Sequence, residues 1–136
     1  MSSWNDNVIA QFRDNGGVTD RWGKSLVVMH TIGAKSGEER ITPVMGLRDG
    51  DGWFVVASKG GAPTNPAWYH NLKANPTFDV EAHIEGEVRT VRVTARELEG
   101  EEHDAAWERI TARAPGFAGY QERTTRRIPI FKLDRV

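Results

Sequence analysis

The chain has 136 residues, no cysteine, and 18 Lys and Arg against 19 Asp and Glu, and it contains no apolar run near the roughly 20 residues that span a bilayer. We therefore expect a single cytoplasmic domain over residues 1–136, without a signal peptide, a transmembrane segment, disulfides or thiolate chemistry. The balanced charge argues against a nucleic-acid partner, and the scattered histidines lack the spacing of metal ligands.

The N-terminal residues 2–15 are predicted to form a helix. Ser3 is a suitable N-cap, and the apolar residues Trp4, Val8, Ile9 and Phe12 recur at helical spacing. The pair Gly16-Gly17 should end the helix. We expect it to pack over one end of the fold and to take no part in ligand binding.

Three strands follow, at residues 24–31, 41–48 and 53–58, with a loop over residues 33–40 and a tight turn over residues 49–52. The first strand is a continuous apolar run, which indicates burial on both faces. Short connections make the three an antiparallel meander. Pro43 lies within the second strand and cannot donate to a ladder, so it must lie at an edge, at a bulge or beside a ligand.

Two glycine-containing loops with basic residues stand out. Gly33 and Gly37 in the first loop can adopt positive φ and bring backbone N–H groups to an anion. The second loop, residues 59–64, precedes a helix at 67–74 for which Asn65 is the expected N-cap and Pro66 the first residue. In a meander both loops lie at the same end of the sheet, which favours a shared anion site over the alternative of two solvated loops.

Two further strands, residues 77–84 and 88–98, flank a turn at residues 85–87. A helix over residues 100–114 follows, then a short helical turn that carries Phe117 and Tyr120, and a last strand at residues 127–133. Six strands with interspersed helices predict a mainly β (α+β) fold, a small antiparallel barrel with helices over its ends.

The ordered motifs of the chain resemble those of the deazaflavin (F420)-dependent nitroreductase family. From Leu26 onward the resemblance rests on Gly33-x-Lys35-Ser36-Gly37, Arg40-x-x-Pro43, Ala57-Ser58-Lys59-Gly60-Gly61 and Asn65-Pro66-x-Trp68-Tyr69-x-Asn71-Leu72-x-Ala74-Asn75-Pro76, and it extends through Tyr120 to Pro129. It implies a six-stranded split β-barrel like that of FMN-binding proteins. It also implies binding of coenzyme F420, an 8-hydroxy-5-deazaflavin with an anionic tail, and hydride transfer from its reduced form to electron-poor organic substrates.

The family's cofactor contacts carry over to residues of both loops, of the second strand and of the helix that follows. The resemblance implies tail contacts from the first loop, ring contacts from the second strand, contacts to phosphate and ring from the second loop, and packing from the helix. The cofactor-binding residues are accordingly Ala34, Lys35, Ser36, Arg40, Thr42, Pro43, Met45, Val56, Ala57, Ser58, Lys59, Gly60, Trp68, Tyr69 and Asn71.

The substrate end departs from the family pattern. Met45 stands where the nitroimidazole-activating members have a tyrosine, and Ala114, Phe117 and Tyr120 match three tyrosines of those members. We expect Met45, Phe117 and Tyr120 to contact substrate, and Tyr120 or Ser58 to donate or orient a proton. This apolar end suits α,β-unsaturated esters or lactones and quinones better than nitroimidazoles.

Two other readings of the same site remain open. FMN could replace F420 in an oxidoreductase of this fold, or the protein could carry F420 without catalysis. The partners expected are small molecules, with the protein a monomer or a homodimer.

Overall fold

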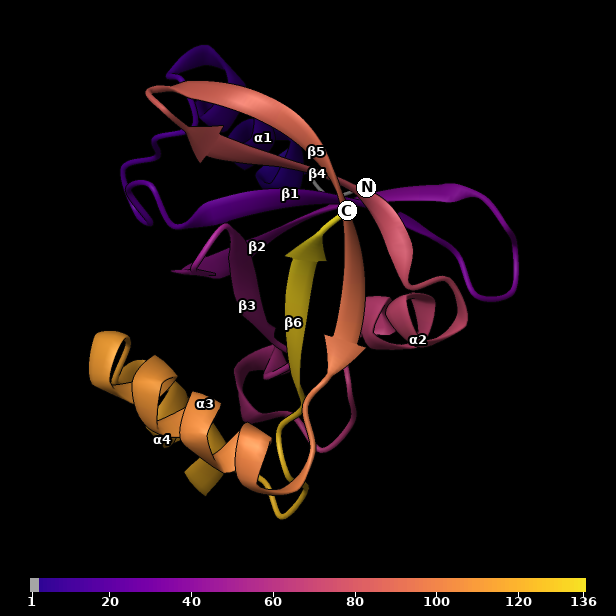
Figure 1. The fold of residues 1–136 in the computed structure, drawn as a ribbon, viewed down its shortest axis with the longest axis vertical. Coiled ribbons are helices and arrows are strands. Elements are labelled where there is room, and N and C mark those ends of the chain that lie inside the picture. Colours follow the sequence, from indigo (N-terminus) through magenta and orange to yellow (C-terminus); the bar gives the residue numbers. More distant parts are fainter. Residues whose placement is uncertain (1–2) are drawn as a thin grey trace.

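The computed structural model describes residues 3–136 and contains six strands and four α-helices (Figure 1). In chain order these are α1 (Ser3–Asp14), β1 (Leu26–Ile32), β2 (Glu39–Asp49), β3 (Gly52–Val56), α2 (Ala67–Ala74), β4 (Thr77–Ile84), β5 (Glu87–Glu97), α3 (Gly100–Arg113), α4 (Gly116–Glu122) and β6 (Ile130–Arg135). A single 3₁₀ turn, η1 (Lys59–Gly61), follows β3. None of the helices in residues 3–136 is both long and apolar enough to cross a membrane.

The strands form a closed antiparallel barrel in the order β1-β2-β3-β6-β5-β4, which confirms the predicted fold class. The predicted bounds are right for α2 and β4 and within a few residues elsewhere. The last strand was predicted to begin at Arg127 and begins at Ile130, because Pro129 has no N–H for the ladder. The prediction for residue 2 lies outside the described residues.

Alternate residues of the strands face two different cores. Val27 and Met29 of β1 point into the barrel, whereas Leu26 and Val28 pack outward against Ile9 and Phe12 of α1. All four strand residues are at most 2% exposed, so the continuous apolar run is buried on both faces, as predicted. Residues on both faces of β1 therefore contribute to a hydrophobic core.

The helices do not all cover barrel ends. Trp68 and Leu72 of α2 belong to the interior core, so α2 closes one end. In contrast, α1 packs on the outer face of β1, and α3 and α4 lie outside the barrel (Figure 1). Ile110 of α3 and Phe117 of α4 belong to one buried cluster with the outward residue Phe54 of β3. The prediction of helices over the ends is therefore right for α2 alone, because the strands also present apolar side chains outward.

The barrel opens along one half of β2. Residues 39–45 of β2 pair with β1, but pairing with β3 begins only at Gly46, which lies opposite Val55. Pro43 pairs with Val28 on the β1 side and has no partner strand on the other side. The predicted edge position of Pro43 is confirmed, and the residues around it face an opening in place of a neighbouring strand.

Candidate cofactor and substrate site

Two cavities adjoin at this opening. The larger one, of about 530 Å³, is lined by Pro43, Val44 and Met45 of β2 together with residues from α1, β3, α2 and α4. The second, of about 500 Å³, lies between the β1–β2 loop and α2. Trp68 lines both cavities, and Thr42 of the second is next in sequence to Pro43 of the first. A ligand lying along the open edge of β2 could therefore occupy both.

The first loop is a compact turn between β1 and β2. The Gly33 N–H donates to the Glu38 carbonyl over 2.8 Å, and the Gly37 N–H donates to the Gly33 carbonyl over 3.0 Å. Gly37 has φ +72°, as predicted, whereas Gly33 does not have positive φ. At Gly33 a Cβ would lie 2.5 Å from the Ser36 Oγ, so this hydroxyl would have to move away from its hydrogen bond with the Glu38 N–H.

Asn71 of α2 holds this loop in place. Its Oδ1 accepts a hydrogen bond from the Ala34 N–H over 2.9 Å, and its Nδ2 lies 3.5 Å from the Thr31 Oγ1. Asn71 thus lines the second cavity and also positions the backbone of the loop. Lys35 and Arg40 line the same cavity and are exposed, and Arg40 lies 3.7 Å from Glu38. The cavity is consequently basic at its open side.

The second loop follows β3 and lines the larger cavity with Ser58 and Lys59. Lys59 has φ +47°, the left-handed conformation that a lysine adopts at an energetic cost. Gly61 also has positive φ, and a Cβ there would lie 2.6 Å from the Tyr120 carbonyl oxygen. The loop is therefore packed directly against α4, which carries the predicted substrate residues.

Arg126 holds this strained loop, a role that the sequence analysis did not predict. Its guanidinium donates to the carbonyls of Ser58 over 2.7 Å, Ala57 over 3.1 Å and Ala62 over 2.9 Å. It also donates to the Asn65 Oδ1 over 2.8 Å, so Asn65 does not cap α2 as predicted; Pro66 occupies the N-cap position. Burial lowers the pKa of Arg126, because desolvation disfavours its charge.

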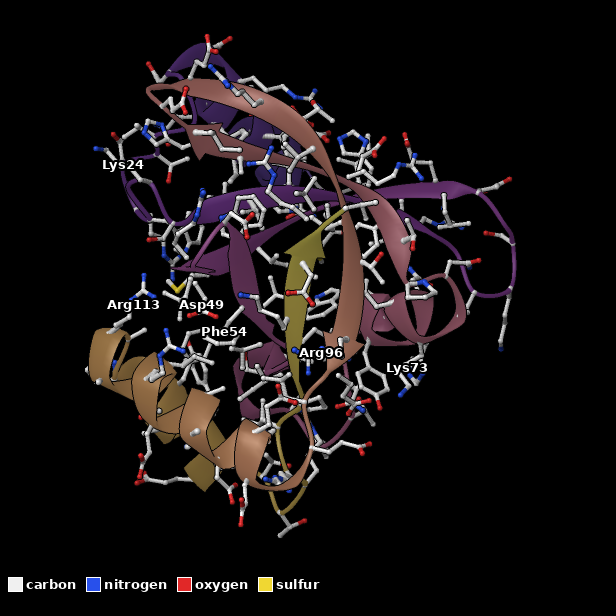
Figure 2. All side chains as sticks on the ribbon, in the orientation of Figure 1. Lys24, Asp49, Phe54, Lys73, Arg96 and Arg113 are labelled. Atoms are coloured by element: carbon white, nitrogen blue, oxygen red, sulfur yellow. The ribbon has the colours of Figure 1, made fainter. Side chains whose placement is uncertain are left out.

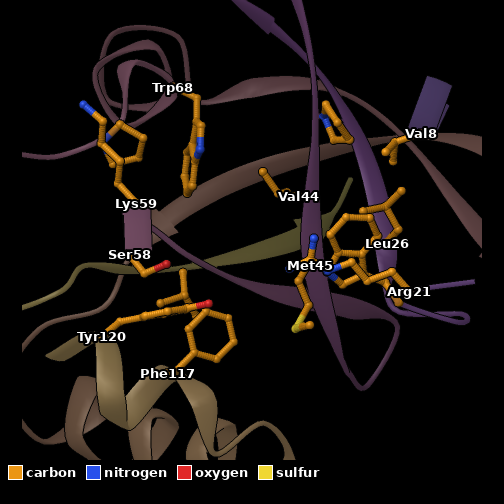
Figure 3. A pocket seen from close by; sticks show the side chains of 14 residues that line it. Val8, Arg21, Leu26, Val44, Met45, Ser58, Lys59, Trp68, Phe117 and Tyr120 are labelled. Carbon is orange, nitrogen blue, oxygen red and sulfur yellow. The ribbon is translucent and has the colours of Figure 1, made fainter. Parts of the chain in front are cut away.

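At the substrate end, Met45 lies across the cavity from α4 (Figure 3). Phe117 and Tyr120 meet edge to face, with ring centroids 5.8 Å apart and an interplanar angle of 81°. The Ser58 and Tyr120 side chains both line the cavity. Among the described residues, neither hydroxyl has a hydrogen-bond partner, so both are available to a ligand.

The structure brings most of the predicted site residues to the two cavities. The larger is lined by Pro43, Met45, Val56, Ser58, Lys59, Trp68, Phe117 and Tyr120. The second is lined by Ala34, Lys35, Ser36, Arg40, Thr42, Trp68 and Asn71. The two basic loops therefore serve adjoining cavities on either side of the first turn of α2. They do not enclose one common anion site.

Ala57 and Tyr69 line neither cavity. Ala57 is fully buried in the barrel core, and its backbone bonds Pro129 and Arg126. The Tyr69 hydroxyl donates to Glu97 over 3.2 Å, and its ring meets Phe131 at 5.6 Å. Burial and the neighbouring Glu97 carboxylate raise the pKa of Tyr69. Gly60 is the middle residue of η1.

The N-terminal segment also reaches the site. Val8 of α1 lines the larger cavity, as do Arg21 and Trp22 of the segment between α1 and β1. This differs from the expectation that the N-terminal helix takes no part in the site. No local signal in residues 3–25 marks them as wall residues, because their position depends on how α1 packs on β1.

The donors and shapes of the two cavities fit a flat ring with a multiply anionic tail. Lys35 and Arg40 offer cationic donors at the second cavity, and Lys59 offers another at the mouth of the larger one. Between them, Pro43, Val44 and Trp68 make an apolar passage suited to an aromatic ring system.

Comparisons with known proteins agree with this geometry. A family model described as F420H(2)-dependent quinone reductase matches residues 4–134. An F420H(2)-dependent quinone reductase of Mycobacterium tuberculosis (strain H37Rv) is 44% identical over 112 residues, covering 80% of this chain and 72% of that protein. The F420-H2 dependent reductase FDR-A matches with a TM-score of 0.71 and 42% identity, over 86% of this chain and 97% of that one.

A further solved structure, described as a domain-swapped dimer, matches with a TM-score of 0.72 and 40% identity, over 95% of this chain and 93% of that chain. The family match covers nearly the whole of the described chain, including α1. The chain belongs to the family of F420H2-dependent quinone reductases and is an oxidoreductase whose cofactor is coenzyme F420.

Proposed function

We propose that this protein reduces quinones with F420H2, with the coenzyme tail in the second cavity and the ring and the quinone in the larger one. The observation that carries the proposal is that the two cavities share Trp68 as a wall residue beside the open edge of β2. When bound, the reduced coenzyme supplies a hydride from its ring. The protein then has to bind the coenzyme, orient the quinone and provide a proton to the reduced quinone.

The tail is held by charge and by backbone donors. Lys35, Ser36 and Arg40 lie on the open side of the second cavity, where they can bind phosphate and carboxylate groups. Asn71 keeps the loop in one conformation through its bond to Ala34. Because the loop is ordered before the coenzyme binds, less conformational entropy is lost on binding.

The ring lies in the apolar passage between β2 and the second loop. Pro43 and Val44 form one wall, and Trp68 with Val56 forms the facing part of the cavity. Proline at an unpaired strand edge leaves no N–H unsatisfied, so an apolar ring can cover it without a desolvation cost. Arg126 keeps Ser58 and Lys59 at the rim of this passage.

The quinone lies beyond the ring, against Met45, Phe117 and Tyr120. These side chains form an apolar slot for a planar substrate. A quinone that takes up a hydride becomes a hydroquinone monoanion, and one proton then completes the hydroquinone. Tyr120 or Ser58 supplies or orients that proton, because both hydroxyls face the cavity. Unsaturated esters, lactones and nitro compounds are further candidate substrates of the same slot.

Two further properties of the protein are predictions from its sequence. The protein is predicted to be cytoplasmic, and to be a monomer or a homodimer. The relative whose structure is described as a domain-swapped dimer supports the homodimer. Size-exclusion chromatography with light scattering would distinguish the two states.

The experiment that tests the function has two parts. The purified protein is mixed with F420 and with FMN, and binding is followed by the absorbance and fluorescence of each cofactor. The protein is then incubated with F420H2 and with menadione, an enone or a nitroimidazole. We expect binding of F420 but not FMN, and faster oxidation of F420H2 with menadione than with the other two acceptors. Binding without oxidation above background would instead indicate a carrier.

A further inference from the structure

We propose that the turn over residues 19–25 is a substrate-recognition wall, in which Arg21 binds a negatively charged substituent on a planar apolar substrate. The proposal rests on the proposed function and names the substrate class more closely. It concerns the end of the larger cavity that lies away from Lys59. Four features of the turn support it.

The turn is ordered by its own hydrogen bonds. Thr19 and Gly23 exchange two backbone hydrogen bonds, with N···O distances of 2.9 and 2.8 Å. The Thr19 Oγ1 accepts a third from the Trp22 N–H over 3.1 Å, and Thr19 is only 4% exposed. Residues 20–22 at the tip are therefore presented in one backbone conformation before a substrate binds.

The turn is also tied to α1 through Gln11. The Gln11 amide donates to the Asp20 carboxylate over 2.9 Å and accepts from the Asp20 backbone N–H over 3.1 Å. Ile9 and Phe12 anchor this part of α1 in the outer core. The position of Arg21 relative to the barrel is thus fixed from both sides, as a recognition residue requires.

The location of the turn places it at the substrate end. Figure 3 shows Arg21 beside Leu26 and Met45, on the opposite side of the cavity from Lys59 and Trp68. Trp68 also lines the second cavity, to which we assign the coenzyme tail. The coenzyme ring is therefore expected on the Trp68 side of the larger cavity. The space near Arg21 remains for the part of the substrate that is far from the tail.

The charge of Arg21 is available to a ligand. Within residues 3–136, Arg21 takes part in no ion pair, and the neighbouring Asp20 carboxylate is engaged by Gln11. The Arg21 Cζ lies 4.9 Å from the centre of the Trp22 ring, an arrangement that orients the guanidinium but leaves its N–H groups free to donate. Val8, Leu26 and Met45 line the same cavity with apolar surface. One directed cation in an apolar wall favours an anionic group such as a carboxylate over a neutral carbonyl.

The test uses two matched ligands, a 1,4-naphthoquinone with a propanoate side chain and the methyl ester of the same compound. Binding is measured without coenzyme, through quenching of tryptophan fluorescence, so the result does not depend on turnover. For Arg21→Gln we expect Kd for the carboxylate to rise roughly three- to tenfold and Kd for the ester to change less than about twofold. Lys24→Gln is the control, because Lys24 is an exposed cation of the same turn (Figure 2) that does not line the cavity.

Three results would overturn the proposal: equal changes for the two ligands, an equal effect of the Lys24 variant, or no preference of the wild type for the carboxylate. Arg21→Lys keeps the charge and should retain part of the preference for the carboxylate. This variant distinguishes loss of the charge from misfolding of Arg21→Gln. Gln11→Ala tests the positioning role and should reduce the preference while Arg21 is still present. If F420H2 is not oxidised but the preference is found, the proposed function fails and the recognition wall stands.

Discussion

Arg126 donates a hydrogen bond to the carbonyl oxygen of Ser58 over 2.7 Å, although the two residues are 68 positions apart. The same guanidinium binds the carbonyls of Ala57 and Ala62, so one side chain closes the loop around Lys59. The segment before β6 thereby fixes the rim of the cavity that we assign to the coenzyme ring. Removal of this side chain would leave the Ala57 and Ala62 carbonyls without this donor, whereas the Ser58 carbonyl would keep its bond from the Gly61 N–H.

We predict that Arg126→Gln weakens F420 binding about tenfold or more and lowers the free energy of unfolding by about 2–4 kcal/mol. The glutamine is too short to reach the three carbonyls and carries no charge. Loss of the loop geometry would then reduce the affinity. Urea denaturation and a fluorescence titration with F420 measure the two effects.

Arg127→Gln is the matched control for that variant. Arg127 bonds His103, the Gly100 carbonyl and Asp104, and therefore holds α3 and not the cofactor loop. Arg127→Gln should destabilise the protein while leaving Kd for F420 within about twofold of the wild-type value, since Arg127 lines neither cavity. Equal losses of affinity in the two variants would show that general destabilisation, and not the loop, explains the result.

We predict that the contribution of the two loop lysines to F420 affinity depends on ionic strength. Lys35 and Lys59 are both exposed and line the second and the larger cavity respectively. Lys35→Ala and Lys59→Ala should each weaken F420 binding severalfold at low ionic strength and by a smaller factor at high ionic strength, because salt screens exposed charges. Lys24 lines neither cavity, so Lys24→Ala should leave the F420 affinity unchanged at both low and high ionic strength. Wild-type affinity in either loop variant would remove that lysine from the tail site.

The fold was predictable where the signals are local. The apolar run of β1, the Asp49–Gly52 turn and the stop at Asn75-Pro76 each fix an element from a few neighbouring residues. Side-chain partners across the barrel were not predictable in this way. Asn65 looks like an N-cap by sequence, yet its carbonyl oxygen accepts from Arg126, more than 60 residues later.

The motifs predicted which residues line the two cavities better than they predicted how tertiary packing completes the cavity walls. The motifs placed Lys35, Ser58 and Trp68 correctly at the cavities. They also included Tyr69, which turns toward Glu97, because successive helical residues point to different sides. Arg21 has no motif of its own, and only the packing of α1 on β1 brings it to the cavity wall.

The hydroxyls of Tyr120 and Ser58 are the two candidate proton donors to the reduced quinone. If Tyr120 supplies the proton to the reduced quinone, Tyr120→Phe should lower kcat about tenfold or more with little change in KM, because the aromatic ring and its contact with Phe117 remain. Ser58→Ala should then have the smaller effect. Steady-state kinetics with menadione over a range of pH, with the solvent isotope effect, measure this. Unchanged kcat in both variants would identify water as the proton source.

Glu81 joins α1 to the barrel through a partly buried ion pair with Arg13. Its carboxylate accepts from Arg13 over 2.9 and 2.6 Å and lies 2.7 Å from the His30 Nε2, while Glu81 is only 7% exposed. The His30 Nδ1 lies 3.4 Å from Glu39. The hydrogen bonds from Arg13, and then those from His30, hold the pKa of Glu81 below its ordinary value of 4.5, against the opposing effect of burial.

The lowered pKa of Glu81 determines how its contribution to the free energy of unfolding changes with pH. A carboxyl whose pKa is lower in the folded state stabilises the protein above its unfolded pKa, and the stabilisation is lost as the pH falls through the folded value. Glu81→Gln should therefore cost about 1–3 kcal/mol of unfolding free energy at pH 7, and the gap to wild type should narrow below about pH 4. Urea denaturation across this range measures the gap.

Glu85→Gln is the control for the Glu81 variant, since Glu85 is an exposed carboxylate that pairs with Arg89 at 3.2 Å. It should cost less than about 0.5 kcal/mol at any pH, because solvent screens the pair. A gap between Glu81→Gln and wild type that stays constant from pH 7 to about pH 3 would contradict the charge argument. The loss would then come from the altered geometry of the amide beside Arg13.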